Sequence, residues 1–124
     1  MSKKCILEKE GVQAIVDYLN GDETRKTTTL AVRYSLQELS RLYPGRSVEV
    51  RIPPAGATQI LDGNTHRRGT PPAVVESSPK VWIELCVGTM TWEEAVAKNL
   101  IEANGERSNL SRLLPIFTLS SSQP

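Results

Sequence analysis

Residues 71–117 carry a series of start and stop signals that restricts how this chain can fold. Ser78 is a suitable N-cap for a helix that begins at Pro79, because proline has no N–H to leave unbonded at that position. Gly88 can adopt the left-handed conformation that ends a helix. Between these signals, three apolar side chains share one face at helical spacing: Trp82, Leu85 and Cys86. The pattern predicts a helix with a buried face over residues 79–88.

The second half of this stretch predicts a helix, a strand and a last helix. Thr91 and Glu94 form a T-x-x-E capping box, in which the hydroxyl and the carboxylate each bind one otherwise unpaired backbone N–H. The inward side chains of that helix are Trp92, Ala95, Val96 and Asn99. Residues 100–103 are short and apolar enough for a strand, which Asn104-Gly105 ends. Positions i, i+3, i+4 and i+7 then predict the last helix, with Leu110, Leu113, Leu114 and Phe117 on one face.

The first half of the chain predicts two helices and three strands. Apolar residues recur at helical spacing over residues 11–20 and 30–43, so both segments should be amphipathic helices. Residues 47–52 alternate between apolar and charged side chains, which is typical of a half-buried strand. We expect this strand to pair with residues 57–61 as an antiparallel hairpin. A short third strand follows at residues 74–76.

The order of these elements predicts an α+β domain. A chain of 124 residues is one domain by the usual size range. Amphipathic helices must cover a sheet or one another, because their apolar stripes cannot remain in water. We therefore expect a mainly antiparallel sheet of about four or five strands, with helices packed on one face.

Charge and hydropathy exclude several classes of partner. The formal net charge of +1 gives no long-range field that would attract nucleic acid. No apolar run reaches the roughly 18–20 residues of a membrane helix, and the first ten residues have no signal-peptide core. Cys5 and Cys86 are far apart and are expected to be free thiols in a reducing compartment. We predict a cytoplasmic protein, without stable membrane insertion, that is a monomer or a weak homodimer.

Several of these motifs together resemble a known family. The run W-x-x-L-x-x-G-x-x-T-W-x-x-A-V-x-x-x-x-I-x-x-x-G, residues 82–105, resembles the C-terminal half of the sterol carrier protein family of lipid-binding domains. PGRSVEVRIPP (44–54) and HRRGTPPAVVESSPKVW (66–82) resemble the small stand-alone branch of that family found in actinobacteria. The resemblance covers about residues 36–115. It implies the same α+β layout and a space between sheet and helices that holds an apolar ligand.

The residue patterns also predict how the chain is divided. Residues 1–119 would be one sterol-carrier-like domain, followed by a disordered tail at 120–124. Within the domain, residues 1–10 would be a leader, 11–43 the N-terminal helices and 44–119 the sheet with its helices. The last helix, at the chain end and rich in leucine, could lift as a lid over the cavity.

A lipid carrier needs an apolar cavity with few polar groups inside. The candidate ligand-binding residues are the inward apolar side chains of the strands and of the later helices: Val48, Val50, Ile52, Ile60, Trp82, Leu85, Trp92, Leu110, Leu113, Leu114 and Phe117. Each of them would fit a solid core equally well. The alternative is therefore a protein-interaction or scaffold domain with a filled core.

His66, Arg67 and Arg68 form the one concentrated polar motif. Two guanidinium groups and an imidazole could bind a phosphate or carboxylate head group, which makes an anion-headgroup or nucleotide binder the second alternative. The structural interpretation is a loop whose arginines pair with nearby acids, such as Glu49, Asp62 or Glu76.

Catalysis is not expected from these residues. Cys86 with His66 is the only combination of a thiol and an imidazole worth considering, and Cys86 falls on a helix face that should be buried, where a thiol stays protonated. One histidine and two distant cysteines do not make a metal site. We predict no catalytic residue, no metal and no cofactor, and a non-enzymatic binder or carrier of a fatty acyl or sterol-like lipid.

Overall fold

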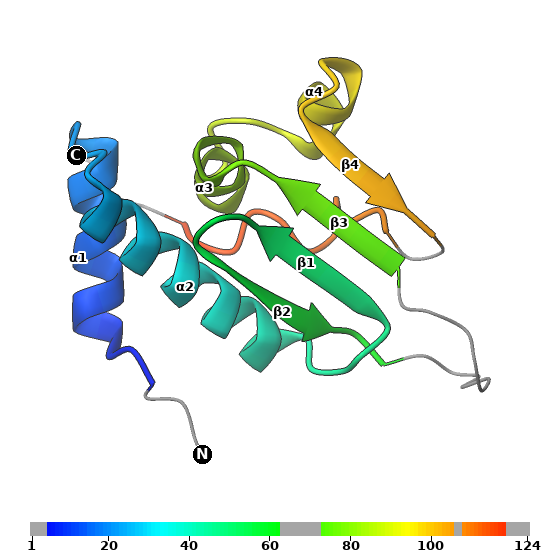
Figure 1. Cartoon of the computed structure of the whole chain (residues 1–124), viewed down its shortest axis with the longest axis horizontal. Helices are drawn as coiled ribbons and strands as arrows, with labels where there is room; N and C mark the ends of the chain where they lie inside the picture. The colour runs from blue at the N-terminus through cyan, green and yellow to red at the C-terminus, as the bar shows by residue number, and fades with distance from the viewer. Residues whose placement is uncertain (1–4, 63–72, 106–107, 119–124) are drawn as a thin grey trace.

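The computed structural model describes residues 5–62, 73–105 and 108–118 (Figure 1). In these ranges the predicted α+β class is confirmed, with four helices and four strands. Their order along the chain is α1 (Glu8–Leu19), α2 (Arg25–Leu42), β1 (Val48–Ile52), β2 (Gly56–Ile60), β3 (Ala73–Ser77), α3 (Pro79–Val87), α4 (Trp92–Ala97) and β4 (Ile101–Asn104).

The four strands form one mixed sheet in the order β2-β1-β3-β4. The predicted hairpin is confirmed, because β1 and β2 pair antiparallel with Val50 opposite Thr58. β3 also pairs antiparallel with β4. The central pair, β1 with β3, is parallel, so the sheet is mixed rather than antiparallel throughout (Figure 1).

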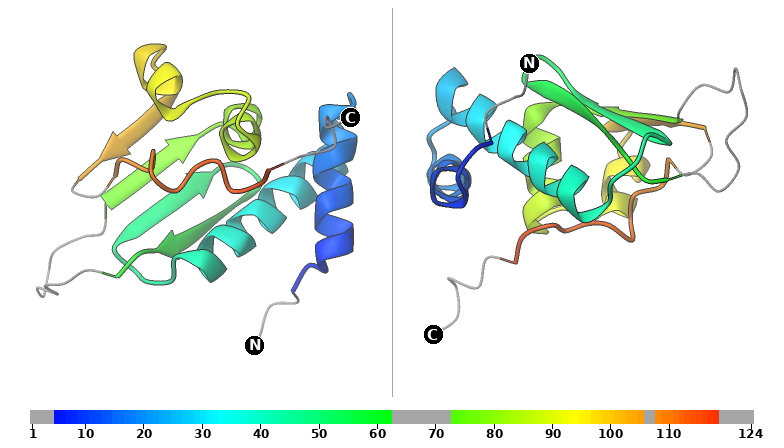
Figure 2. Two further views of the ribbon diagram at one scale, coloured as in Figure 1. Left: turned by 180° about the vertical axis from the view of Figure 1, so that it is seen from behind. Right: turned by 90° about the horizontal axis from the view of Figure 1, so that it is seen from below.

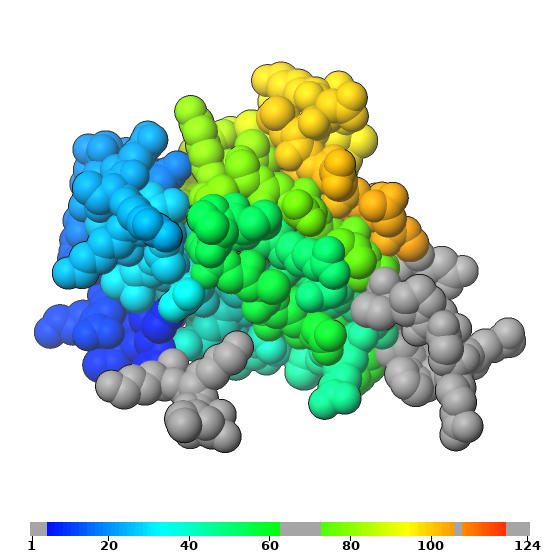
Figure 3. Space-filling view, in the orientation of Figure 1, coloured from blue at the N-terminus to red at the C-terminus, as the bar shows by residue number. Residues whose placement is uncertain are grey.

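The two faces of the sheet differ in what covers them. α3 and the C-terminal segment, residues 108–118, lie across one face, while α2 flanks β2 and α1 packs on α2 (Figure 2). Val48, Val50 and Ile52 of β1 are fully buried on the covered face. The opposite face leaves the strands at the surface (Figure 3), where Arg51 pairs with Glu49 at 3.1 Å. The alternation in the sequence therefore separates core from solvent as expected.

Both N-terminal helices begin earlier than their apolar patterns indicate. α1 starts at Glu8, so it includes the last three residues of the predicted leader. Just before it, the Gln37 side chain accepts from the Ile6 N–H at 2.8 Å and donates to the Ile6 carbonyl at 2.9 Å. The Gln37 side-chain amide on α2 thus binds both backbone groups of Ile6, as a neighbouring strand would.

α2 starts at Arg25 because its N-terminus is capped. The Thr24 hydroxyl accepts from the Thr27 N–H at 3.4 Å. The Asp22 carboxylate accepts from the backbone N–H and the hydroxyl of Thr24, and also from the Thr27 hydroxyl. These hydrogen bonds hold the pKa of Asp22 below its usual value. The predicted start of this helix at residue 30 is therefore five residues too late, since the threonines cap and continue the helix.

The predicted last helix is also wrong. Residues 108–118 form a single turn, in which the Leu113 N–H donates to the Leu110 carbonyl at 2.9 Å, and then run extended. Pro115 explains the difference, because it cannot donate a helical hydrogen bond and disfavours the helical conformation in the residue before it. The N–H groups of Ile116 and Phe117 instead donate to the Cys86 carbonyl at 2.9 and 3.0 Å.

Candidate functional site

The predicted ligand-binding residues gather in one apolar core between the sheet, α3, α4 and the C-terminal segment. Eight of them are buried: Val48, Val50, Ile52, Ile60, Trp82, Leu85, Trp92 and Leu110. The other three belong to the C-terminal segment and are half-buried: Leu113, Leu114 and Phe117. The sequence pattern therefore selected side chains that do meet in space, although the last group is not on a helix.

A cleft of about 290 Å³ opens at the edge of this core, between the end of α3, the start of α4 and the C-terminal segment. This volume lies just below the range of about 300–1,000 Å³ for small-molecule sites. We call it the apolar cleft. Its lining residues are Leu85, Gly88, Met90, Thr91, Trp92, Glu93, Ser111, Leu114 and Pro115. Three of the predicted residues line it directly, and the others belong to the core behind it or pack against that core.

The turn between α3 and α4 shapes the floor of the apolar cleft. Gly88 has a φ of 88°, so it supplies the left-handed C-cap that its position predicts. The Glu84 carbonyl accepts from the N–H groups of Gly88 and Thr89, each at 3.0 Å, and from that of Met90 at 3.3 Å. This tight turn brings the half-buried Met90 to the cleft.

The predicted capping box sets the first residues of α4. The Glu94 carboxylate accepts from the Thr91 N–H at 2.8 Å, and the Thr91 hydroxyl accepts from the Glu94 N–H at 3.0 Å. With the helix start fixed, Trp92 is buried and Glu93 is exposed at the rim. Sequence reasoning missed Glu93 and Met90 as lining residues, although the capping box was a usable signal for the position of Glu93.

The apolar cleft has three walls, which are the end of α3, the start of α4 and the C-terminal segment. The C-terminal segment is the third wall. The two hydrogen bonds to the Cys86 carbonyl attach it to α3. The Phe117 ring stacks on the Tyr34 ring of α2, with centroids 5.7 Å apart and an interplanar angle of 13°. Few directional contacts therefore hold this wall, compared with the hydrogen-bonded sheet opposite it.

Polar groups behind the apolar cleft are paired with one another. The Trp82 indole N–H donates to the Ser35 hydroxyl at 2.8 Å, and that hydroxyl donates to the Val32 carbonyl at 2.6 Å. Burial raises the pKa of the Cys86 thiol far above its ordinary value, while the nearby Ser35 side chain acts in the opposite sense. In the described ranges, no buried side-chain nitrogen or oxygen lacks a partner. These buried polar groups therefore need no partner from a ligand in the cleft.

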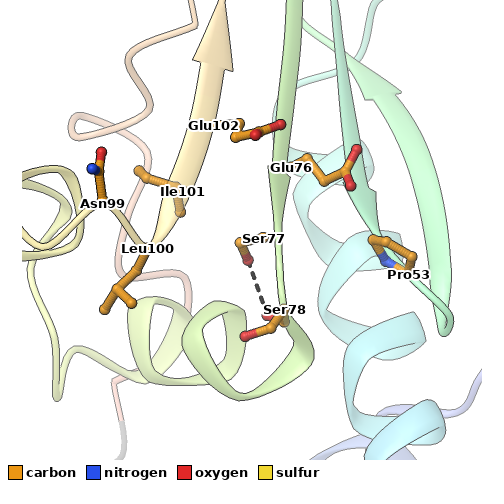
Figure 4. Close-up of a pocket in the computed structure, with 8 residues that line it drawn as sticks. All are labelled: Pro53, Glu76, Ser77, Ser78, Asn99, Leu100, Ile101 and Glu102. Atoms are coloured by element: carbon orange, nitrogen blue, oxygen red, sulfur yellow. Dashed lines mark hydrogen bonds between the residues drawn. The ribbon is translucent and has the colours of Figure 1, made fainter.

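A second hollow, of about 370 Å³, lies where β3 and β4 meet the start of α3 (Figure 4). We call it the polar hollow. Glu76 and Glu102 are directly opposite each other on the paired strands, and both line it. The remaining lining residues are Pro53, Ser77, Ser78, Asn99, Leu100 and Ile101. Two carboxylates make this hollow a poor site for an acyl chain.

The model of the family described as bacterial SCP orthologs, where SCP denotes sterol carrier protein, matches residues 24–116, which is three quarters of the 124 residues. The chain belongs to this family. The match runs from the N-cap of α2 to Ile116, so it includes every lining residue of the apolar cleft and omits α1. No curated protein sequence matches the chain.

The second predicted site of this family member, His66, Arg67 and Arg68, lies outside the described residues. Of the acids suggested as partners, Glu49 binds Arg51 and Glu76 lines the polar hollow. The anion-headgroup alternative therefore stays a prediction. Over the ranges that the structure describes, no group of three or more histidine, cysteine or acidic side chains is placed to hold a metal ion. No helix there is long and apolar enough to cross a membrane.

Proposed function

We propose that this protein binds or carries an apolar or amphipathic small molecule, such as a fatty acyl or sterol-like lipid, without catalysing a reaction on it. Membership of the SCP ortholog family supports the lipid class. The observation that carries the proposal is the third wall of the apolar cleft. It is an extended segment rather than a helix, and Leu114 on it lines the cleft together with Leu85 and Trp92.

The free energies involved favour a wall that yields to a ligand. Two hydrogen bonds of about 0.5–1.5 kcal/mol each attach the wall to α3. The stacked pair of Phe117 and Tyr34 adds about 0.5–1.5 kcal/mol. Each buried CH₂ of a ligand contributes about 0.8 kcal/mol, so roughly six methylenes offset the loss of all three contacts. An acyl chain long enough to replace the apolar packing of Leu114 and Phe117 as well would displace the wall and deepen the cleft towards the core.

The absence of catalysis is part of the proposal. Cys86 is fully buried, and its raised pKa keeps the thiol protonated and a poor nucleophile. Cys5 is exposed, precedes α1 and is not a lining residue of the apolar cleft. The lining residues supply one carboxylate, two hydroxyls and no imidazole, which suits binding better than acid–base chemistry.

Native mass spectrometry of the purified protein, before and after extraction with organic solvent, tests the proposal directly. We expect a mass excess that disappears on extraction and identifies the class of ligand. The absence of any excess, together with no uptake of a fluorescent acyl probe, would contradict it.

Two matched variants locate the site. Leu114→Trp places a larger side chain in the apolar cleft, and we expect it to lower the uptake of the acyl probe by tenfold or more, or about 1.4 kcal/mol. Leu100→Trp makes the same change at an exposed position in the polar hollow and should leave uptake unchanged. Equal uptake by both variants would show that the ligand lies elsewhere.

The interaction-domain alternative also has an observation in its favour. Val96 was predicted on the inward face of its helix but is 50% exposed, and Leu100 is 37% exposed. Both precede β4, which is an edge strand. Exposed apolar side chains beside an unpaired strand edge suit association with a second chain. If this is the function, light scattering should show a dimer that the double substitution Val96→Glu and Leu100→Glu dissociates, with no extractable ligand.

A further inference from the structure

Within the proposed function, we infer that the apolar cleft selects amphiphiles with a neutral or positively charged head group over carboxylates. Glu93 is the one ionised side chain among the lining residues. Its position at the rim puts the carboxylate where the head group of a bound amphiphile would meet water. A carboxylate head group there would be repelled, and an ammonium group would be attracted.

The charges around the rim reinforce this preference. In the described part of the chain, the Glu93 carboxylate makes no ion pair or hydrogen bond that would neutralise it. Glu94 adds a second negative charge beside it, engaged with the Thr91 backbone. The C-terminal segment, residues 108–118, contains one basic residue, Arg112. Its side chain is exposed and does not line the cleft.

The uncharged polar groups of the apolar cleft suit a neutral head group. The Thr91 oxygen accepts from the Glu94 N–H, which leaves its own hydroxyl hydrogen able to donate. Ser111 supplies a second hydroxyl from the opposite wall. The volume of about 290 Å³ holds roughly ten groups of the size of a water molecule, at about 30 Å³ each. A single short chain with a hydroxyl or amine head therefore matches the cleft in volume.

Competition between three amphiphiles of one chain length tests the inference. Decylamine, decanol and decanoate would each be titrated against bound N-phenyl-1-naphthylamine, a neutral fluorescent probe, at neutral pH and below their micelle concentrations. Decanoate is then ionised and decylamine protonated, so only the head group differs. We expect decylamine and decanol to bind more tightly than decanoate. Tighter binding of decanoate would overturn the inference.

Two charge-removing variants show whether Glu93 is responsible. Glu93→Gln should reduce the ratio of decylamine to decanoate affinity by roughly 1.5- to 5-fold, the range measured for exposed charge pairs. Glu102→Gln removes the same charge from the polar hollow and should leave the ratio unchanged. An unchanged ratio in Glu93→Gln, or an equal change in both variants, would overturn the inference alone. Failure of the probe and of all three amphiphiles to bind would overturn the proposed function as well.

Discussion

The indole N–H of Trp82 donates to the Ser35 hydroxyl at 2.8 Å, which joins α3 to α2 in the interior of the protein. Trp82 is 0% exposed and Ser35 is 1% exposed, so water cannot replace either partner. The Ser35 hydroxyl in turn donates a hydrogen bond to the Val32 carbonyl. A core tryptophan is therefore placed by one specific acceptor as well as by packing, and it is the largest fully buried side chain behind the apolar cleft.

Ser35→Ala should lower the free energy of unfolding by about 1–3 kcal/mol, because the buried indole N–H loses its acceptor. Urea denaturation followed by circular dichroism measures the change. Ser40→Ala, on the same helix at a half-buried position, is the matched control and should stay within about 0.5 kcal/mol of the parent. Equal stability of the two variants would show that the hydrogen bond is not required.

Gly11→Ala should destabilise the protein although alanine is the better helix former. A Cβ at Gly11 would overlap the ring atoms of Tyr34, which packs against α1. We expect a loss of about 1–3 kcal/mol, the usual cost of overpacking. Lys9→Ala, at an exposed position of α1, is the control. A stabilised Gly11→Ala variant would mean that α1 can move away from α2 at little cost.

Elements with start and stop residues were predictable from the sequence, because those residues act within one helical turn. Ser78 caps α3 by accepting from the Val81 N–H at 3.3 Å, and Gly88 ends it. The T-x-x-E capping box of α4 forms both of its hydrogen bonds. Alternating side chains likewise identified β1 and its hairpin partner.

The remaining errors of the sequence predictions have physical causes that the spacing of apolar residues does not reveal. The spacing of Leu110, Leu113 and Leu114 fits a helix, but Pro115 prevents one, and the same side chains reach the core from an extended segment. The parallel pairing of β1 with β3 depends on long-range packing rather than on local residues. The apolar cleft includes Met90 and Pro115 from connecting segments, whose positions no periodic pattern predicts.

Stability should fall with rising pH because of Cys86. The folded-state pKa of this thiol is raised above its ordinary value of 9.0, so the folded protein holds a proton that the unfolded chain releases. Its contribution is complete below about pH 9 and declines above it, with a slope of about 1.4 kcal/mol per pH unit. The effect of Cys86 alone can be followed up to about pH 10. Above that pH, Tyr18 and Tyr34, whose pKa values are also raised from 10.0, begin to change the stability as well.

Urea denaturation between pH 8 and pH 10 measures this slope, which should begin near the ordinary thiol pKa of 9.0. Cys86→Ala should flatten it, whereas Cys5→Ala, which removes the exposed thiol, should keep it. Thiol labelling gives a second readout, since Cys5 should react at once and Cys86 only on unfolding. Equal slopes in the two variants, or immediate labelling of Cys86, would contradict the prediction.

Phe117→Ala should loosen the C-terminal wall without unfolding the sheet. The substitution removes the ring that stacks on Tyr34, a contact of about 0.5–1.5 kcal/mol beyond its buried area. If the wall opens locally, the amide of Ile116 should exchange its hydrogen roughly two- to twelve-fold faster, which is that free energy expressed as a ratio. Hydrogen exchange followed by NMR measures each amide separately.

The amide of Val50, in the centre of the sheet, shows whether the opening is local. It should exchange at the parent rate in Phe117→Ala, because β1 keeps both of its neighbouring strands. Leu42→Ala, at an exposed position on α2, removes apolar atoms away from the wall and should change neither amide. If Ile116 and Val50 instead accelerate together, the wall opens only when the whole domain unfolds. A ligand could then enter the apolar cleft only through the gap already present, which limits it to a short chain.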